Sequence, residues 1–402
     1  MAQGQDKISR SKYQAALLDD SDFLCELVTH VLQNILEHEI SEHVSADRYE
    51  RTDSRNGYRN GSYSRVVKTR VGRLELSIPR DREGNFQTSL FARYQRNEQA
   101  LLLSLMEMTI NGVSTRKVTK ITEQLCGTSF SRSLVSSLCS DLDEKLEVWR
   151  NRPISGKWPY VYIDAIYEKG RCDHRIQSMA VLIAKGVNAI GKRSVLGIKV
   201  CSSENSSDYS DFFKSLLQRG LSGVQLVISD DHSGLVNAIR SNFVGASWQR
   251  CMVHFQRNLF AKLRKQDRSW VMGSMRDVYN APDGQTADIR VREVIEKLTK
   301  SRLDVSDWLE ASVPDTLSYF NFPSAHRKRI RSTNCLERLN EEIRRRSRVI
   351  RIYPNAASCL RMTSAICQEY DEEWTTGKRY LDMSLLLDQA EAISIEKIRR
   401  AV

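Results

Sequence analysis

The 402-residue sequence lacks the cysteine patterns that stabilise small secreted proteins or bind structural zinc. Its nine cysteines are scattered and odd in number, and no Cys-x-x-Cys pair occurs among them. This distribution argues against a disulfide framework and against a zinc ribbon. We therefore expect reduced thiols, as in a cytoplasmic protein.

Long apolar runs are missing as well. No stretch approaches the roughly 18 apolar residues that a membrane span needs, and residues 1–10 are polar, unlike a secretion signal. No internal repeat or low-complexity tract is visible. The hydrophobic fraction of 41% still suffices for a sizeable core, and the length indicates roughly two to four domains. We expect a chain with no membrane partner.

Positive charge is in excess, with a formal net charge of +11. This balance favours an acidic polymer as partner, although a membrane surface or plain solubility would also fit it. The densest basic cluster, residues 327–351, holds ten Lys/Arg against three Glu. Glu337 lies inside it, and a carboxylate held among arginines suggests metal and phosphate chemistry.

Residues 334–346 predict a helix with two distinct faces. Leu336, Leu339 and Ile343 form an apolar stripe. The polar face, which can look into a site, consists of Glu337, Asn340, Glu341 and Arg344. An alternative remains open, because Asn334 as N-cap and Glu337 at the third helical position also form a reasonable capping arrangement.

The N-terminal third alternates between helical and strand-like patterns. Residues 12–46 carry apolar side chains at helical spacing, which is typical of a core or a dimer seam. Residues 48–96 mix twelve Lys/Arg with tyrosines and phenylalanines, with turn signals at 56–57 and 60–61 and short strands expected at 65–68 and 73–78. Such a mixture suits phosphate contacts and base stacking, but a solvated hairpin has the same composition.

Residues 98–150 return to helical periodicity. Residues 112–125 and 131–142 predict two helices, with Gly127 in the turn and Ser129 or Ser131 as cap of the second. A DNA-reading helix-turn-helix and an ordinary helical hairpin both fit this pattern. A boundary is expected at 151–156, where proline and glycine close the helical region.

A strand-rich region follows. Residues 160–167 place Asp164 within a buried-looking strand, which is costly for a carboxylate unless a metal or partner accepts it. Further strands are expected at 176–184, 194–201 and 224–229, with a helix at 207–219. This order predicts an α/β fold with a mixed sheet, as in the ribonuclease-H-like fold.

Asp230 ends the fourth strand and can become a neighbour of Asp164, with Glu337 arriving from a later helix. Three carboxylates can hold two Mg²⁺ ions about 4 Å apart, which activate an oxygen nucleophile and stabilise a leaving oxygen. An aspartate at a strand end is also common as a cap or turn former, and His232 could form local hydrogen bonds only.

Three acidic motifs occur in a characteristic order. They are residues 162–165 with Lys169 and Arg171, residues 226–235, and residues 333–340 with Arg344 to Arg346. Together they resemble the motifs of the bacterial Mutator-type insertion-sequence transposases, a family of DDE enzymes. The resemblance covers nearly the whole chain, since residues 248–258 are similar to the family's Cys-x-x-His element and residues 55–59, 79–82 and 93–96 to its basic N-terminal region.

The resemblance implies a transposase that binds the terminal inverted repeats of its element, cuts a DNA strand and joins it to target DNA. Asp164, Asp230 and Glu337 would be catalytic and hold two Mg²⁺, which Mn²⁺ can replace. Asp231 stands where the family more often has a small residue, and Asp230 is favoured over it as ligand. A homodimer or higher oligomer is implied, acting on nucleoid DNA in a bacterial cytoplasm.

The predicted DNA contacts are basic residues of the N-terminal region and of the Glu337 helix. They are Arg55, Arg59, Arg80, Arg82, Arg93, Arg96, Arg116, Lys117, Arg132, Arg338, Arg344, Arg345 and Arg346. Residues expected to assist the site are His232, Cys251, His254, Asn334 and Asn340. Zinc is disfavoured for Cys251 and His254, because no second Cys/His pair has usable spacing; a helix beside the aspartates is expected instead.

The expected organisation has seven parts. They are a helical segment (1–47), a basic β-containing DNA-contact region (48–97), a helix-turn-helix-like region (98–150), a first core part (151–258), a helical insertion domain (259–330), a second core part (331–375) and a C-terminal helix (376–402). Two other functions remain open: a DNA-binding repressor or end-binding protein, and a nuclease that only hydrolyses.

Overall fold

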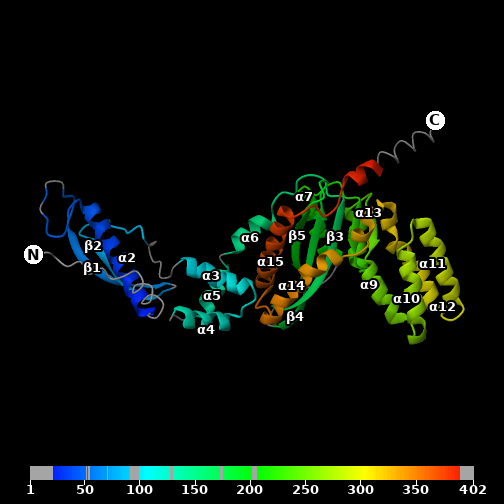
Figure 1. The fold of residues 1–402 in the computed structure, drawn as a ribbon, viewed down its shortest axis with the longest axis horizontal. Helices are drawn as coiled ribbons and strands as arrows, with labels where there is room; N and C mark the ends of the chain where they lie inside the picture. Colours follow the sequence, from blue (N-terminus) through cyan, green and yellow to red (C-terminus); the bar gives the residue numbers. More distant parts are fainter. Residues whose placement is uncertain are drawn as a thin grey trace, which may run out of the picture. The chain divides into compact units, whose positions relative to one another are not determined.

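The computed structural model describes residues 21–50, 52, 55–69, 71–90, 99–126, 130–140, 142–172, 175–201 and 206–389. The chain forms two compact units, Met1–Asp141 and Leu142–Val402 (Figure 1). Helix α6 (Asp143–Arg150) therefore belongs to the second unit. The sequence had predicted that it belongs to the helix-turn-helix-like region, residues 98–150. The reason for this difference is a long-range contact: Arg361 donates to the Asp143 carboxylate at 2.7 Å.

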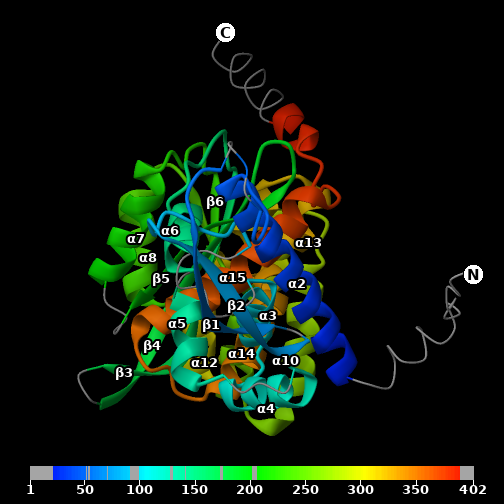
Figure 2. The same ribbon diagram turned by 90° about the vertical axis from the view of Figure 1, so that its left-hand side faces the viewer.

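In the first unit, helix α2 (Ser21–Val44) packs on the antiparallel hairpin of β1 (Arg59–Thr69) and β2 (Gly72–Asp81) (Figures 1 and 2). The core between them consists of Leu36, Val67, Leu74, Leu76 and Ile78. The expected helix and both strands are thus confirmed within the described residues. Asn60-Gly61 is not a turn, however, because it lies inside β1 at a shift in register, where Gly61 has a φ of +67°.

Three short helices of the same unit enclose their own small core. They are α3 (Gln99–Ile110), α4 (Thr115–Cys126) and α5 (Arg132–Ser140). Leu105, Val118, Phe130 and Val135 are buried among them. Ser131 caps α5 as expected, because its Oγ accepts from Leu134 N at 3.2 Å. Gly127 and Ser129 lie outside the described residues.

The second unit is an α/β structure built on a five-stranded mixed sheet of order β5-β4-β3-β6-β7. Its strands are β3 (Tyr160–Cys172), β4 (Arg175–Val187), β5 (Arg193–Cys201), β6 (Leu226–Ser229) and β7 (Ser247–Arg250). The first three strands are antiparallel, whereas β6 and β7 run parallel to β3. Four of these strands were expected from the sequence. Strand β7 was not, since no strand was predicted after residues 224–229; the helix expected for Cys251 and His254 is α9, which begins after β7.

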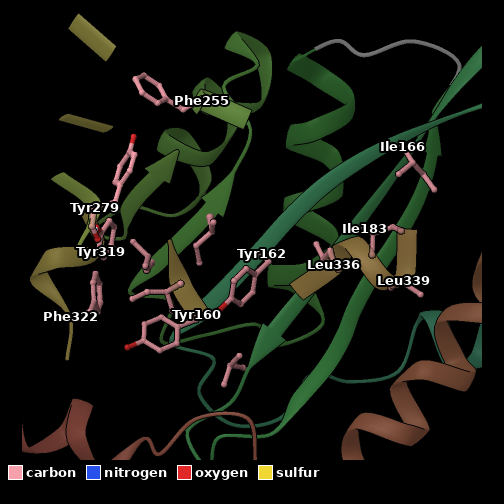
Figure 3. Close-up of a cluster of buried hydrophobic side chains, with 14 of the residues drawn as sticks. Tyr160, Tyr162, Ile166, Ile183, Phe255, Tyr279, Tyr319, Phe322, Leu336 and Leu339 are labelled. Carbon is pink, nitrogen blue, oxygen red and sulfur yellow. The ribbon is translucent and has the colours of Figure 1, made fainter. Parts of the chain in front are cut away.

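Helices cover both faces of this sheet, so β3 is buried on both sides. Tyr160 and Tyr162 point to one face, and Val161 and Ile163 to the other. The second face is covered by α7 (Ser206–Gln218) and α8 (Ser233–Asn242). Figure 3 shows side chains buried on the first face, among them Tyr160 and Tyr162 of β3 and, beside them, Leu336 and Leu339 of a later helix.

The helices after β7 share the core on the first face. They are α9 (Met252–Lys262), α10 (Lys265–Tyr279), α11 (Gly284–Thr299), α12 (Leu303–Ser312), α13 (Ser324–Ile330), α14 (Asn334–Ile350) and α15 (Ala356–Thr376). Residues 259–330 are mainly helical, as expected. Their apolar side chains join one cluster with β3, α14 and α15, so within the described residues they form no separate core.

The C-terminal segment is helical over residues 384–389, and residues 390–402 lie outside the described residues. Within the described parts of the chain, none of the helices combines the length and apolar composition that a membrane crossing requires. The fold therefore brings the part of β3 around Asp164, and the ends of β6 and β7, to the start of α14, where the acidic residues are found.

Candidate active site

The parallel register of the sheet brings the two aspartates together. Tyr162 of β3 is level with Ile228 of β6, so Asp164 and Asp230 are level two residues further along. Both carboxylates line a cavity of about 260 Å³ beside the ends of β6 and β7. The expectation that these two aspartates become neighbours is thus supported by the strand pairing.

Asp164 is held in a mostly buried position. Its Oδ2 accepts from Asn340 Nδ2 at 2.6 Å, and its Oδ1 accepts from the Ala165 backbone N–H at 3.0 Å. Burial, followed by the negative charge of Asp230, raises the pKa of Asp164 to about 6. Two carboxylates that repel one another in this way form a site that a cation would stabilise.

Asp230 is paired with the Cys-x-x-His element. His254 Nδ1 faces Asp230 Oδ1 as an ion pair. The hydrogen bonds to Asp230 and to Cys251 raise the pKa of His254 to about 10. Burial alone would raise the pKa of the Cys251 thiol, but hydrogen bonds from His254 and Thr333 outweigh it, so the net pKa of Cys251 is lowered.

Asp231 points to a different partner. Its carboxylate forms a 2.8 Å ion pair with Arg250, the last residue of β7, whose side chain is almost fully buried. The Arg250 guanidinium also lies over the rings of Phe255 and Trp308. This pairing favours Asp230, and not Asp231, as the carboxylate that faces Asp164.

Glu337 lies on the first turn of α14. The N-cap of this helix is Thr333, and no side chain caps it, so the alternative in which Asn334 caps the helix is wrong. The Thr333 hydroxyl donates instead to Cys251 Sγ at 3.4 Å. Glu337 is half-exposed, with Oε1 3.9 Å from the Arg257 guanidinium that lines the cavity.

Asn340 connects α14 to the strand aspartates. It lies three residues after Glu337, and the two residues share one side of the helix. The adjoining side buries Leu336, Leu339 and Ile343 completely, as expected. Asn340 is itself buried, and among the described residues no donor reaches its Oδ1. An orphaned oxygen beside Asp164 is a further candidate ligand for a hard cation.

The three consecutive arginines of α14 have different environments. Arg346 is buried and paired with Glu342 and Glu369, at 2.7 and 2.9 Å, so its guanidinium is removed from the predicted DNA contacts. Arg345 is exposed and also paired with Glu342 at 2.7 Å. Arg344 is exposed. Burial of Glu168 raises the pKa of that carboxyl, and the positive charge of Arg344 offsets part of this increase.

The N-terminal arginines also separate into two groups. Arg59 is mostly buried and binds Glu37 and Ser41 of α2 at 2.7 Å, so it holds the hairpin to the helix and is corrected to a structural residue. Arg55 lies over Tyr58 and donates to the Glu50 carbonyl at 2.7 Å, a local arrangement. The exposed members are Arg80, Arg82, Arg116 and Lys117.

Three of the predicted contacts cannot be placed by their side chains. Arg93 and Arg96 lie outside the described residues, and only the backbone of Arg132 is described.

The remaining predicted site residues are placed by the structure. Arg338 is exposed on α14, and Asn334 is exposed at the first position of that helix. His232 lines the cavity with its ring 5.6 Å from that of Tyr209.

The hairpin carries a groove of about 810 Å³ with basic and aromatic walls. Arg80 stacks over Tyr63 at 4.6 Å there. Basic residues of this groove that the sequence interpretation did not select are Arg65, Lys68 and Arg73. Guanidinium groups stacked on tyrosines are suited to phosphate and base contacts.

Arg250, Arg257 and Thr333 were also not selected from the sequence. Each takes part in the site through a residue far along the chain: Arg250 through Asp231, Arg257 through Glu337, and Thr333 through Cys251. The local signals were the position of Arg250 and Arg257 within the Cys-x-x-His stretch, residues 248–258, and that of Thr333 in the third acidic motif, residues 333–340.

Comparison with known proteins agrees with the motifs. A family model described as "Transposase, Mutator family" matches residues 1–377. The chain is 43% identical over 383 residues to the transposase for insertion sequence element ISRM5 of Rhizobium meliloti, covering 95% of this chain and 96% of that protein.

Other relatives show similar identity. The chain is 42% identical to the transposase for IS406 of Burkholderia multivorans, covering 92% of this chain and 96% of that protein. It is 41% identical to the transposase for IS256 in transposon Tn4001 of Staphylococcus aureus, covering 88% and 91%. On this agreement of motifs, family model and relatives, the chain belongs to the Mutator family of transposases.

Proposed function

We propose that this transposase is a DDE enzyme in which Asp164, Asp230 and Glu337 hold two Mg²⁺ ions and act on DNA phosphodiesters. The observation that carries the proposal is the level position of Asp164 and Asp230 on one cavity, with the pKa of Asp164 raised to about 6. Carboxylate oxygens, with the unpaired Asn340 Oδ1 beside them, form a donor set that Mg²⁺ or Mn²⁺ prefers.

When bound, the two ions supply an activated oxygen nucleophile and stabilise charge on the leaving oxygen. Asp164 and Asp230 orient the site, because each has a fixed partner: Asn340 for Asp164 and His254 for Asp230. Arg257, beside Glu337 on the cavity wall, is positioned to hold a DNA phosphate. No residue needs to form a covalent intermediate, since each step is an in-line attack at phosphorus.

The sheet topology supports a ribonuclease-H-like core. Three antiparallel strands, β3 to β5, are followed by β6 and β7 parallel to β3, with helices on both faces. In this reading, residues 259–330 are helices added between the second aspartate and Glu337. Asp230 and Glu337 are far apart along the chain. The helices between them pack into one hydrophobic core with the sheet and with α14.

DNA recognition is proposed for the first unit. The basic groove of the hairpin, with Arg80 over Tyr63, would contact phosphates, and α4 with α5 would read terminal inverted repeats as a helix-turn-helix. Two copies of the chain would hold the two ends of an element, which makes a homodimer the smallest working assembly. The DNA of the bacterial nucleoid would be the target.

One assay tests the catalytic proposal against its two alternatives. Purified protein is incubated with a labelled terminal repeat, a target plasmid and Mg²⁺. Joined products support a transposase that transfers strands. Cleavage without joining would indicate a nuclease that only hydrolyses, and binding without cleavage would indicate a repressor or end-binding protein.

A further inference from the structure

We infer that Asp230, Cys251 and His254 form a second metal site, which binds a thiophilic divalent ion such as Zn²⁺ and shares Asp230 with the proposed Mg²⁺ site. One ligand atom from each residue lies within 4.8 Å of the other two. Ligands of tetrahedral zinc are about 2.0–2.3 Å from the ion and therefore roughly 3.3–3.8 Å apart, so the three groups need to close only slightly. Sulfur, nitrogen and oxygen together suit Zn²⁺ or Co²⁺, whereas Mg²⁺ takes oxygen ligands.

The fold holds the three side chains at adjacent chain ends. Asp230 follows β6, and Cys251 follows β7. The backbone N–H of Cys251 donates to the Ser229 carbonyl at 2.7 Å, which fixes these two ends side by side. Cys251 is also the N-cap of α9, so His254 stands on the first helical turn, where the three-residue spacing directs both side chains to one side.

The surroundings of the sulfur are those of a metal-bound thiolate. Cys251 is fully buried, yet its Sγ accepts from both the backbone N–H and the hydroxyl of Thr333 at 3.4 Å. Donors of this kind orient a ligand and tune its affinity for the ion. Asp230 and His254 line the cavity, and three protein ligands match the arrangement of zinc sites that keep a fourth position open, in contrast to closed structural ones.

Occupation of this site would oppose the proposed function. An ion bound to Asp230 together with Cys251 and His254 withdraws this carboxylate from Asp164 and from the Mg²⁺ that they would share. Binding releases the thiol proton and requires a neutral imidazole. The inference rests on the proposed function only for this consequence, namely that Zn²⁺ inhibits Mg²⁺-dependent strand cleavage.

Cobalt provides a direct test that needs neither DNA nor activity. The full chain, freed of metal by a chelator, is titrated with Co²⁺ and followed by absorption. We expect a sulfur-to-cobalt charge-transfer band with the visible bands of tetrahedral cobalt, both displaced by Zn²⁺. Cys251→Ser should lose the charge-transfer band, whereas the control Cys172→Ser, which changes a half-buried thiol on β3, should keep it.

His254→Gln provides a second variant in case Cys251→Ser fails to fold, which circular dichroism would reveal. It should weaken Co²⁺ binding by at least about 10-fold, as expected when a ligand is lost. A charge-transfer band that persists in Cys251→Ser, or no band in the wild-type protein, would overturn the inference.

The inhibitory consequence is measured separately. Cleavage at fixed Mg²⁺ is titrated with Zn²⁺, and each protein is compared with its own zinc-free rate. Cys251→Ser should need at least about 10-fold more Zn²⁺ for half inhibition than wild type or Cys172→Ser. A protein that shows the Cys251-dependent band but has no cleavage activity would support this metal site and contradict the proposed function. A protein that cleaves DNA but shows no band would support the proposed function and contradict this metal site.

Discussion

The end of the five-stranded sheet and the β1–β2 hairpin both gather charged residues, but they hold them in different ways. At the sheet end, Asp164 is mostly buried and its carboxylate is fixed by Asn340 at 2.6 Å. On the hairpin, Arg80 is exposed and lies over Tyr63 at 4.6 Å. Burial with fixed partners preorganises a site for chemistry, whereas exposed stacked arginines can adapt to a polymer.

The largest effect should come from the acidic residues. Asp164→Ala, Asp230→Ala or Glu337→Ala should each reduce cleavage and joining by at least about 1,000-fold, since several kcal/mol of charge stabilisation are lost. Binding to terminal repeats, measured by gel shift, should remain nearly intact. Asp231→Ala is the matched control and should be milder, because Asp231 is already paired with Arg250. The opposite ranking of Asp230 and Asp231 would show that the wrong neighbour was assigned.

Asn340→Ala should reduce strand transfer by about 10- to 100-fold and raise the Mg²⁺ concentration for half activity, as loss of a residue that orients a metal ligand does. The reason is that Asp164 loses its 2.6 Å hydrogen bond. Asn334→Ala, at the exposed start of the same helix, should behave like wild type. Equal metal requirements for Asn340→Ala and wild type would remove Asn340 from the site.

The raised pKa of Asp164, about 6, gives a stability prediction for the metal-free protein. Between its ordinary pKa and about 6, the unfolded chain is ionised at Asp164 while the folded chain is not, so the free energy of unfolding falls as pH rises. Asp164→Asn should therefore raise that free energy at pH 7 by about 1–3 kcal/mol, and this gain should vanish near pH 4.

The measurement is urea unfolding in the presence of a chelator. Asp211→Asn, which changes an exposed aspartate on α7, is the control and should leave the pH dependence unchanged. A metal-free Asp164→Asn protein less stable than wild type at pH 7 would contradict the picture of a carboxylate held at electrostatic cost.

The arginines of α14 sharpen the comparison at the level of single side chains. Arg344→Ala should weaken strand transfer by about 10-fold, because an exposed guanidinium can bind a phosphate bidentately. Arg345→Ala should cost less, since Arg345 is neutralised by Glu342 at 2.7 Å. Similar losses for both variants, each rescued by lower ionic strength, would indicate only a diffuse electrostatic surface.

The smallest effect is expected on the hairpin. Arg80→Ala should lower affinity for terminal repeats roughly threefold and reduce the salt dependence of binding by about one phosphate contact. Arg59→Ala should instead lower the thermal stability of the first unit without changing the salt dependence, because Arg59 binds Glu37. A salt dependence altered more by Arg59→Ala than by Arg80→Ala would reverse the two assignments.

Much of the fold was predictable because its signals are local. The stripe of Leu336, Leu339 and Ile343 predicted the buried side of α14, and the apolar run around Asp164 predicted β3. Strand β7 was not predictable in this way. Its four residues include Gln249 and Arg250, which are buried yet polar and are satisfied by Tyr319 and Asp231. Periodicity cannot detect a strand whose buried side chains are polar.

The sequence by itself determined the order of the acidic motifs, the excess of positive charge and the alternation of helices and strands, because each depends on residue type and spacing along the chain. Only the tertiary structure decided which charges are available. It paired Arg346 with Glu369, Arg59 with Glu37 and Asn340 with Asp164, the last across 176 positions. Such partners are chosen by packing between distant segments, and spacing along the chain contains no record of that choice.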